Sequence, residues 1–463
     1  MRRIALALAV LAALGFACDP EQDAAAPRAT SGPSQADGLK HIVFDTDLAF
    51  DDIMALLYLL QRDDVAIDAV TITGTGEAHC DPGVSNALRL LALGGETDVP
   101  VACGRETPLQ GTNAFPDEWR TAVDDLSMLD LPEVDATADP RGATDLLLDT
   151  LDGDATLITL GPLTNVAEAL RADPALAERV PEFVAMAGAI DTVGNTPNGV
   201  AEYNVWVDPL AAREVIAEMD VSLVPLDATE DVPFTSFFVD ALDEHLTTPE
   251  AEAVRAIIAS NEPIFTQGGY QFWDTLATAL VFRPELATWD EARVLVTASL
   301  DAGAGWIDRW DEGATVRFAN AVPDPLAFES EYLSVLTGED VTAVRPEPTI
   351  TIVFDGERCT VEPSPVGSGE QVLDYVGPPG ETDNAFLIGL DGATYAEIRR
   401  FLGPDGSIVP PAEGPPEGVR EVAFVQGLTK AEVPDLTLVA VCFEPTAQGS
   451  ARAWLSRPLQ VEP

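Results

Sequence analysis

Four aspartates fall within eight residues near the start of the chain: Asp45, Asp47, Asp51 and Asp52. Four like charges at one turn repel each other. A hard divalent cation such as Ca²⁺ takes carboxylate, carbonyl and water oxygens as ligands, and would remove this repulsion. Asp51 and Asp52 also have a simpler interpretation, as an N-cap and a first-turn acid that favour the helix dipole. That interpretation leaves Asp45 and Asp47 unexplained, and from this stretch alone both interpretations stay open.

The elements on either side place these acids at the end of a strand. Ile42–Phe44 is an apolar run typical of a buried strand, and Ile53–Leu60 carries a broad apolar stripe that predicts a helix. In open α/β sheets, ligands bind in the crevice at the carboxyl ends of the strands. The four acids are therefore expected at a ligand-binding edge.

Strand-like and helix-like segments alternate after this stretch. The strand-like runs cover residues 65–73, 155–160, 183–187 and 221–225, and the helical ones 84–93, 163–170, 209–218, 250–264 and 274–281. This alternation predicts an α/β domain with an open, mostly parallel sheet. The helix predicted at residues 84–93 is expected to follow a loop from Gly74 to Gly83.

The sequence pattern changes near residues 340–347, where helical periodicity nearly vanishes and proline and glycine become more frequent. Short β-like runs follow at 349–354, 421–424 and 436–443, with one helical piece at 393–401. This pattern predicts a second, smaller all-β sandwich domain of about 115 residues. The expected division is therefore an α/β domain over 39–340 and a β-sandwich over 347–463.

Residues 1–18 are typical of an export signal, with Arg2 and Arg3 before an apolar segment that ends in small residues. The segment is too short to span a membrane. It resembles a bacterial lipobox ending at Cys18, although Gly15 stands where an aliphatic residue is usual. We expect a lipid anchor at Cys18 in the bacterial cell envelope (periplasm or surface), with ordinary secretion as the alternative. Residues 19–38 predict a disordered linker.

The net charge excludes some classes of binding partner, and the cysteines indicate disulfide bonds. The formal net charge of -53 argues against nucleic-acid binding and against attraction to anionic lipid, which leaves a lipid anchor as the only expected membrane contact. Without Cys18, four of the five cysteines remain. Because export favours disulfides, we expect Cys80–Cys103 in the first domain and Cys359–Cys442 in the second, with free buried thiols as the alternative.

Several motifs resemble the inosine-uridine nucleoside hydrolases when taken in order. Residues 45–52, DTDLAFDD, resemble the family's DxDPGxDD signature. The further matches are LGPLTN at 160–165, MAG at 186–188, GN at 194–195 with AEYN at 201–204 and VDP at 207–209, and WD at 273–274. Each motif is weak alone, but five in order over residues 40–337 make coincidence a poor explanation.

The resemblance implies an open α/β sheet with one Ca²⁺ at the strand ends. The implied ligands are the carboxylates of Asp47, Asp52 and Asp274 and the backbone carbonyl of Leu160. Asp47 would also take the proton from the attacking water, as general base. The implied reaction releases free base and ribose from a ribonucleoside, a small-molecule partner, through an oxocarbenium-like transition state.

The same resemblance assigns substrate contacts. Asp51, Asn195, Glu202 and Asn204 match the sugar-contacting positions, with capping of a loop as the alternative for the last three. Met186 belongs to the turn beside the substrate. Trp273 stands where the family has histidine or tryptophan, and stacking on a purine there is the preferred interpretation over a core aromatic.

The three histidines offer little acid chemistry. We expect His41 to be structural and His245 to lie on the surface, while His79, in the loop before the second helix, is the one near the predicted site. Its role as an acid is the less favoured interpretation.

Three departures from the family pattern affect the predicted site. Leu48-Ala49 replaces the usual Pro-Gly, so the metal loop cannot keep the same backbone angles if glycine was needed there. Glu77 stands in the loop that usually carries Gly-Asn, and is expected to take a sugar contact. The segment from Met186 to Asn195 is one residue longer than expected. These changes bear mainly on base preference.

The sequence therefore predicts an exported, calcium-dependent nucleoside hydrolase that favours purine ribonucleosides and forms a homo-oligomer. The alternative is a surface lipoprotein that binds a nucleoside or other riboside without catalysis. A third hypothesis is hydrolysis of a different N-glycoside.

Overall fold

The structure is a computed structural model, and it describes residues 38–266, 270–377, 385–402, 407–408, 417–425, 429–445 and 451–462. The predicted export signal, Cys18 and the linker up to residue 37 lie outside these residues. Among the helices in the described ranges, none combines the length and the apolar character needed to cross a bilayer.

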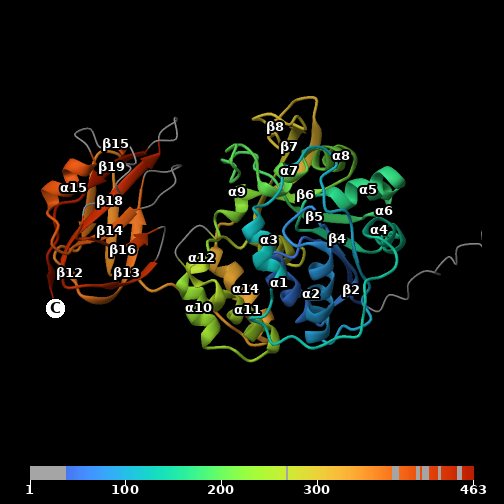
Figure 1. Cartoon of the computed structure of the whole chain (residues 1–463), viewed down its shortest axis with the longest axis horizontal. Coiled ribbons are helices and arrows are strands. Elements are labelled where there is room, and N and C mark those ends of the chain that lie inside the picture. The colour runs from blue at the N-terminus through green and yellow to red at the C-terminus, as the bar shows by residue number, and fades with distance from the viewer. Residues whose placement is uncertain are drawn as a thin grey trace, which may run out of the picture. The chain divides into compact units, whose positions relative to one another are not determined.

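The first domain is built on one nine-stranded sheet (Figure 1). In spatial order its strands are β3 (Val101–Cys103), β2 (Val65–Ile72), β1 (Lys40–Thr46), β4 (Thr156–Thr159), β5 (Glu182–Met186), β6 (Ser222–Val224), β9 (Ala314–Ala321), β7 (Thr288–Val296) and β8 (Ile307–Arg309). Strands β3 to β9 in this order pair in parallel, and β7 and β8 are antiparallel. The expected open, mostly parallel sheet is confirmed.

Helices cover both faces of this sheet. Those that contribute to the core on one face are α1 (Phe50–Leu60), α2 (Cys80–Leu93), α9 (Leu226–Thr229), α10 (Ser236–Asp243), α11 (Pro249–Ser260), α12 (Glu262–Thr266), α13 (Trp273–Leu280) and α14 (Pro325–Thr337). Those on the other face are α4 (Ala143–Thr150), α5 (Thr164–Ala172), α6 (Leu176–Arg179), α7 (Tyr203–Val207) and α8 (Pro209–Glu218). Helix α3 (Asp117–Asp124) and a 3₁₀ turn at Pro284–Leu286 add Val123 and Leu286 to the first of these two cores.

Strand β1 is buried on both sides, which explains its continuous apolar run. Val43 and Phe44 are both fully buried, but they belong to the cores on opposite faces because successive side chains alternate across a strand. The strand pairs with β2 on one side and β4 on the other. The residues that leave β1 therefore emerge from the middle of the sheet.

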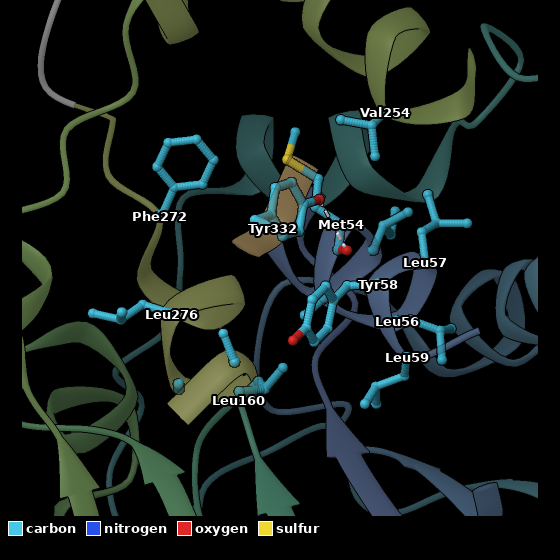
Figure 2. Close-up of a cluster of buried hydrophobic side chains, with 14 of the residues drawn as sticks. Met54, Leu56, Leu57, Tyr58, Leu59, Leu160, Val254, Phe272, Leu276 and Tyr332 are labelled. Carbon is cyan, nitrogen blue, oxygen red and sulfur yellow. Dashed lines mark hydrogen bonds between the residues drawn. The ribbon is translucent and has the colours of Figure 1, made fainter. Parts of the chain in front are cut away.

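Helix α1 is held against α13 and α14 by a buried aromatic cluster (Figure 2). The rings of Tyr58 and Tyr332 stack 5.7 Å apart, and the Tyr332 hydroxyl donates to the Met54 carbonyl at 3.1 Å. Phe272, which immediately precedes α13, packs against this group with its ring tilted by 58° to that of Tyr332 and the centroids 5.9 Å apart. This packing sets the position of the first turn of α1 relative to that of α13.

The strand order reverses between β1 and β4, because the chain runs outward from β1 through β2 to β3 and then returns to β4. Such a reversal leaves a crevice at the carboxyl ends of the two strands, since their connections leave in opposite directions. Asp47 follows β1 and Leu160 follows β4, so the crevice lies between two predicted site residues.

Helix α2 begins earlier than the sequence predicted. The prediction began it at Val84, whereas the structure begins it at Cys80 with His79 as the N-cap residue. Pro82 lies in the first turn, where the missing backbone N–H is not needed for an intrahelical bond. Pro82 and Gly83 were therefore wrongly assigned to a loop.

The C-terminal part is a β-sandwich with one inserted helix, α15 (Tyr395–Phe401). Its sheets have the orders β11-β10-β13-β17 and β15-β19-β18-β14-β16, with β12 and β20 as a separate pair. The strands are β10 (Ile350–Phe354), β11 (Cys359–Glu362), β12 (Val366–Gly367), β13 (Gly369–Val376), β14 (Ala385–Leu390), β15 (Ser407–Ile408), β16 (Val419–Val425), β17 (Thr429–Val433), β18 (Thr437–Pro445), β19 (Ala451–Leu455) and β20 (Val461–Glu462). Residues of both larger sheets share one core, which confirms the all-β second domain.

The four remaining cysteines are paired as expected. Cys80 joins Cys103 with Cα atoms 5.6 Å apart, and Cys359 joins Cys442 at 5.8 Å. The first disulfide ties the start of α2 to the end of β3, and the second links two strands of the sandwich.

Candidate active site

A cavity of about 620 Å³ opens at the carboxyl ends of β1 and β4. It contains every residue that the sequence assigned to metal or substrate: Asp47, Asp51, Asp52, Glu77, Leu160, Met186, Asn195, Glu202, Asn204, Trp273 and Asp274. These residues come from seven separate segments of the chain. The fold therefore brings the whole predicted set to one place, while the role of each residue stays a prediction.

The turn between β1 and α1 is closed by the Asp52 carboxylate. It accepts hydrogen bonds from the backbone N–H groups of Asp47 and Ala49, each at 3.2 Å, and from the Thr46 hydroxyl. Leu48 has φ of 56°, a left-handed conformation that costs an L-residue on the order of 1 kcal/mol. The chain thus forms the turn without the Pro-Gly of the family, but with strain at a buried leucine.

The Asp47 carboxylate is held against two glycines. Its Oδ2 accepts the backbone N–H of Glu77 at 3.1 Å. A Cβ added at Gly76 would lie 2.1 Å from that Oδ2, and one added at Gly161 would lie 2.9 Å from the Asp47 Cβ. Only residues without a side chain fit on these two sides of Asp47.

Four aspartates share this low-dielectric site, and each has a raised pKa. Burial is the largest cause for all four, and it holds the pKa of Asp47 and that of Asp274 well above the ordinary value of 3.8. Burial raises the pKa of Asp52 to about 7, with the charge of Asp51 adding to the shift. The pKa of Asp51 is raised by burial as well. The site therefore disfavours four negative charges unless a cation offsets them.

The donor set fits a hard divalent cation. One oxygen from each of Asp51, Asp52 and Asp274 can be chosen so that all three lie within 4.8 Å of one another. The Oδ1 atom of Asp274 is buried without a hydrogen-bond partner among the described residues. Such an orphaned carboxylate oxygen is costly unless it has a ligand. The oxygen-only chemistry suits Ca²⁺ or Mg²⁺ better than a soft metal.

The structure groups these ligands differently from the sequence prediction. The cluster contains Asp51, which the sequence assigned to the sugar, and it does not contain Asp47. The Leu160 carbonyl accepts the Asn204 amide at 3.1 Å. Because a carbonyl oxygen has two lone pairs, this bond still leaves Leu160 able to take a cation.

Asp51 has a partner that the sequence reasoning missed. The Tyr270 hydroxyl donates to its Oδ1 at 2.9 Å, and the Tyr270 ring lies edge-on to Trp273 with centroids 4.8 Å apart. Both rings line the cavity. The position of Tyr270, four residues before the proposed ligand Asp274, was the only signal in the sequence.

The residues predicted to contact sugar differ in how firmly they are held. Glu202 accepts three backbone N–H groups, from Gly188 at 3.0 Å, Asn204 at 2.6 Å and Val205 at 3.2 Å. It thereby caps α7, which is the alternative interpretation offered above. Burial still raises the pKa of Glu202 to about 7, against the effect of these bonds. Asn195, by contrast, is exposed at the rim of the cavity.

A buried arginine holds the loop that carries Glu77. Arg120 of α3 donates to the carbonyls of Gly74 at 2.9 Å, Glu77 at 3.1 Å and Ala78 at 3.5 Å. Burial raises the pKa of Glu77 well above its ordinary 4.5, and Asp47 raises it further, while Arg120 opposes the shift. Arg120 was not singled out in the sequence, because a lone arginine in a polar helix carries no local signal.

Aromatic side chains from α3, from the residues just before it and from α7 also line the cavity. Phe115 stacks on Tyr203 at 5.0 Å, and Trp119 lies 5.4 Å from the same ring. All three line the cavity, and Trp119 is 44% exposed. Tyr203 stands between Glu202 and Asn204 in the sequence motif, which was the available clue.

The histidines lie elsewhere. Ring Nδ1 of His79 pairs with Asp124 at 2.7 Å, that of His41 with Asp68 at 2.8 Å, and that of His245 with Glu339 at 2.6 Å. None of them is among the described residues that line the cavity. The acid role for His79 therefore has no support from its position.

The comparisons with known proteins agree with this site. The family model of the inosine-uridine preferring nucleoside hydrolases matches residues 42–329, and the chain belongs to this family of glycosylase-type enzymes. The match covers the nine-stranded sheet and the whole cavity. It does not reach the β-sandwich.

Relatives and solved structures cover the same part of the chain. An uncharacterized protein of Schizosaccharomyces pombe is 30% identical, over 62% of this chain and 96% of its own. A pyrimidine-specific ribonucleoside hydrolase of Shewanella woodyi is 31% identical, over 60% and 91%. The structure resembles that of a plant nucleoside hydrolase with a TM-score of 0.58 at 25% identity, covering 64% of this chain and 99% of the other.

Proposed function

We propose that this chain hydrolyses the N-glycosidic bond of ribonucleosides, releasing free base and ribose, in a reaction that depends on Ca²⁺. The observation that carries the proposal is the arrangement of the cavity. The Asp47 carboxylate and the oxygen cluster of Asp51, Asp52 and Asp274 line the same space. The clustered carboxylates and the Leu160 carbonyl would hold the cation, which supplies a positive charge that lowers the pKa of a nearby water molecule.

Asp47 acts as the general base in this proposal. It takes a proton from the attacking water while the water oxygen forms its bond to the anomeric carbon and the bond to the base nitrogen breaks. The Glu77 N–H fixes the Oδ2 of Asp47, and the backbones of Gly76 and Gly161 limit its movement. A base held in this way needs little reorganisation in the transition state.

Asp51, Glu202 and Asn204 bind and orient the ribose hydroxyls. The Asn204 amide N–H₂ is already used by the carbonyls of Leu160 and Met186, each at 3.1 Å, so its carbonyl oxygen is the group that accepts a hydroxyl. Tyr270 sets the direction of the Asp51 carboxylate. Asn195 and Glu77 approach from the loops and complete the sugar contacts.

The aromatic lining supports a preference for purines among neutral bases. Trp273 and Tyr270, together with Phe115, Trp119 and Tyr203, offer more ring surface than a pyrimidine covers. Several curated relatives are named for pyrimidine or uridine substrates, such as uridine nucleosidase 1 of Arabidopsis thaliana at 29% identity. The preferred base is therefore decided by measuring ribose release from purine and pyrimidine nucleosides side by side.

We also propose that the chain is exported and anchored to a bacterial envelope through a lipid on Cys18, and that it forms a homo-oligomer. The N-terminal sequence and the two disulfides support export. The β-sandwich would then be a structural or adhesive appendage.

A non-catalytic riboside-binding protein is the second candidate function. Binding alone does not need a carboxylate fixed in the position of Asp47. An Asp47→Asn variant separates the two functions, because it keeps the size of the side chain but removes the base. An enzyme loses turnover and keeps part of its nucleoside binding, whereas a binding protein shows no turnover before or after the change.

The test of the proposal is ribose release by the purified chain from inosine, adenosine, guanosine, uridine and cytidine. Each is measured with Ca²⁺ and after exhaustive chelation. Release that disappears on chelation and returns with Ca²⁺ supports the proposal, and the five rates rank the bases. Absence of release from all five substrates, with Ca²⁺ shown to be bound, overturns it.

A further inference from the structure

The cavity is strongly one-sided in charge. Seven carboxylates line it, and none of its described lining residues is a lysine, arginine or histidine. Five of the seven acids, Asp47, Asp51, Asp52, Glu202 and Asp274, are proposed above to hold the metal, to act as the base or to bind ribose. The other two are Glu77, which stands in the loop where the family pattern has Gly-Asn, and Glu118 of α3. Glu77 contacts the sugar in the proposed function, but an uncharged side chain would serve for that contact, and Glu118 has no role in it. The negative charge of these two acids therefore exceeds what one divalent cation and a neutral sugar require.

Aromatic rings lie next to this excess of negative charge. Glu118 is adjacent to Trp119 in α3, and Trp119 lies 5.4 Å from the Tyr203 ring. Tyr270 and Trp273 line the same cavity from another segment. The faces of aromatic rings carry partial negative charge and attract cations, most strongly in sites that also exclude water. Rings and carboxylates together favour a flat cation over a flat neutral molecule.

The chemistry of the leaving group points in the same direction. A neutral base leaves as an anion unless it gains a proton, and the carboxylates that line the cavity repel an anion. No histidine among the described residues lines the cavity to supply that proton. A base that already carries a fixed positive charge needs no proton, because the electron pair of the broken carbon–nitrogen bond neutralises it.

We propose that the preferred substrates are ribosides whose base carries a fixed positive charge, such as an N-alkylated purinium or a pyridinium ring. This inference rests on the proposed function, and it names the substrate class of the same site. Water supplies the oxygen that bonds to the anomeric carbon, Asp47 takes the proton, and the base departs as a neutral heterocycle. Glu118 and Trp119 contact the base and distinguish a charged ring from a neutral one.

The first test compares two ring compounds of the same shape. The cation 1-methyl-3-carbamoylpyridinium and the neutral 3-methylbenzamide differ only in a ring nitrogen that replaces a carbon. Each is titrated into the full chain with Ca²⁺ by calorimetry, and each is tested as a competitive inhibitor of ribose release from inosine. We expect the cation to bind at least tenfold more tightly, and to lose part of this advantage at high salt. Equal binding, or tighter binding of the neutral ring, overturns the inference.

Matched variants locate the effect. Glu118→Gln and Trp119→Leu are expected to reduce the ratio of cation to neutral affinity at least threefold. Glu312→Gln and Trp306→Leu, which change an exposed acid and a similarly exposed tryptophan (43% against 44%) outside the cavity, should leave the ratio unchanged. A ratio that is unchanged in the first pair would contradict the assignment of these residues.

The results distinguish a failure of the cation preference from a failure of the proposed function. Hydrolysis of neutral nucleosides without preferential binding of the cation leaves the proposed function standing and removes the inference. Preferential binding of the cation without release of ribose from any nucleoside, neutral or cationic, removes the proposed function but leaves the cation-selective cavity.

Discussion

The position of Gly76 gives the sharpest prediction. A Cβ at residue 76 would lie 2.1 Å from Oδ2 of Asp47 and 2.2 Å from its Cβ. Rotation of the Asp47 side chain cannot relieve both contacts, because the Cβ does not move when χ1 changes. Cβ atoms essentially never approach other atoms within 3.0 Å, so the two backbones must separate by about 0.8 Å to relieve the 2.2 Å contact between the Cβ atoms. The backbone angles of Gly76 do not themselves exclude alanine, since its φ lies outside the left-handed region.

A displacement of about 1 Å at a catalytic group costs on the order of 100-fold in rate. We therefore expect Gly76→Ala to lower kcat/KM by about 100-fold, equivalent to about 2.7 kcal/mol of transition-state stabilisation. The measurement is ribose release at saturating Ca²⁺, with circular dichroism to establish that the variant is folded. The loss should fall mainly on kcat, because Asp47 acts in the chemical step.

Gly142→Ala is the matched control. A Cβ there meets nothing within 4 Å, and its φ of −74° suits alanine. It should retain kcat/KM within about twofold, as an open surface site does. Gly76→Ala with activity within threefold of the unchanged chain, and with normal folding, would refute the argument that Asp47 must occupy its observed position.

Three further predictions address other contacts. Tyr270→Phe removes the hydrogen bond to Asp51 and should lower kcat/KM about tenfold, worth about 1.4 kcal/mol, while Tyr395→Phe in the β-sandwich should have no effect. Glu202 has a pKa of about 7 in the folded chain and 4.5 ordinarily, so the folded state holds more protons between these values and its stability falls as pH rises through them. With a chelator present, the free energy of unfolding of the unchanged chain should therefore drop between pH 4.5 and 8 by about 3 kcal/mol more than that of Glu202→Gln. Parallel pH curves for the two proteins would contradict the assignment of this pH dependence to Glu202. Ca²⁺ at 100 times its Kd should stabilise the chain by about 2.7 kcal/mol, and Asp274→Asn should abolish this gain in thermal unfolding.

Much of the α/β domain follows from local sequence. The apolar run before Asp45 and the alternation of strand and helix patterns predicted a mostly parallel sheet, because a buried strand needs side chains that suit both faces. The order of the motifs was enough to predict which residues share the site. The start of α2 was wrong, because Pro82 and Gly83 read as loop residues even though a first helical turn tolerates them.

The sequence by itself determined the class of fold, the family and the membership of the acidic site, since these depend on residue types at short spacing and on their order along the chain. Only the tertiary structure decided which atoms meet. It placed Asp51 with Asp52 and Asp274, directed Glu202 to backbone N–H groups, and brought Arg120 and Tyr270 to the site. These partners come from segments far apart in the chain. Their distances depend on how the helices pack on the sheet, which no local pattern encodes.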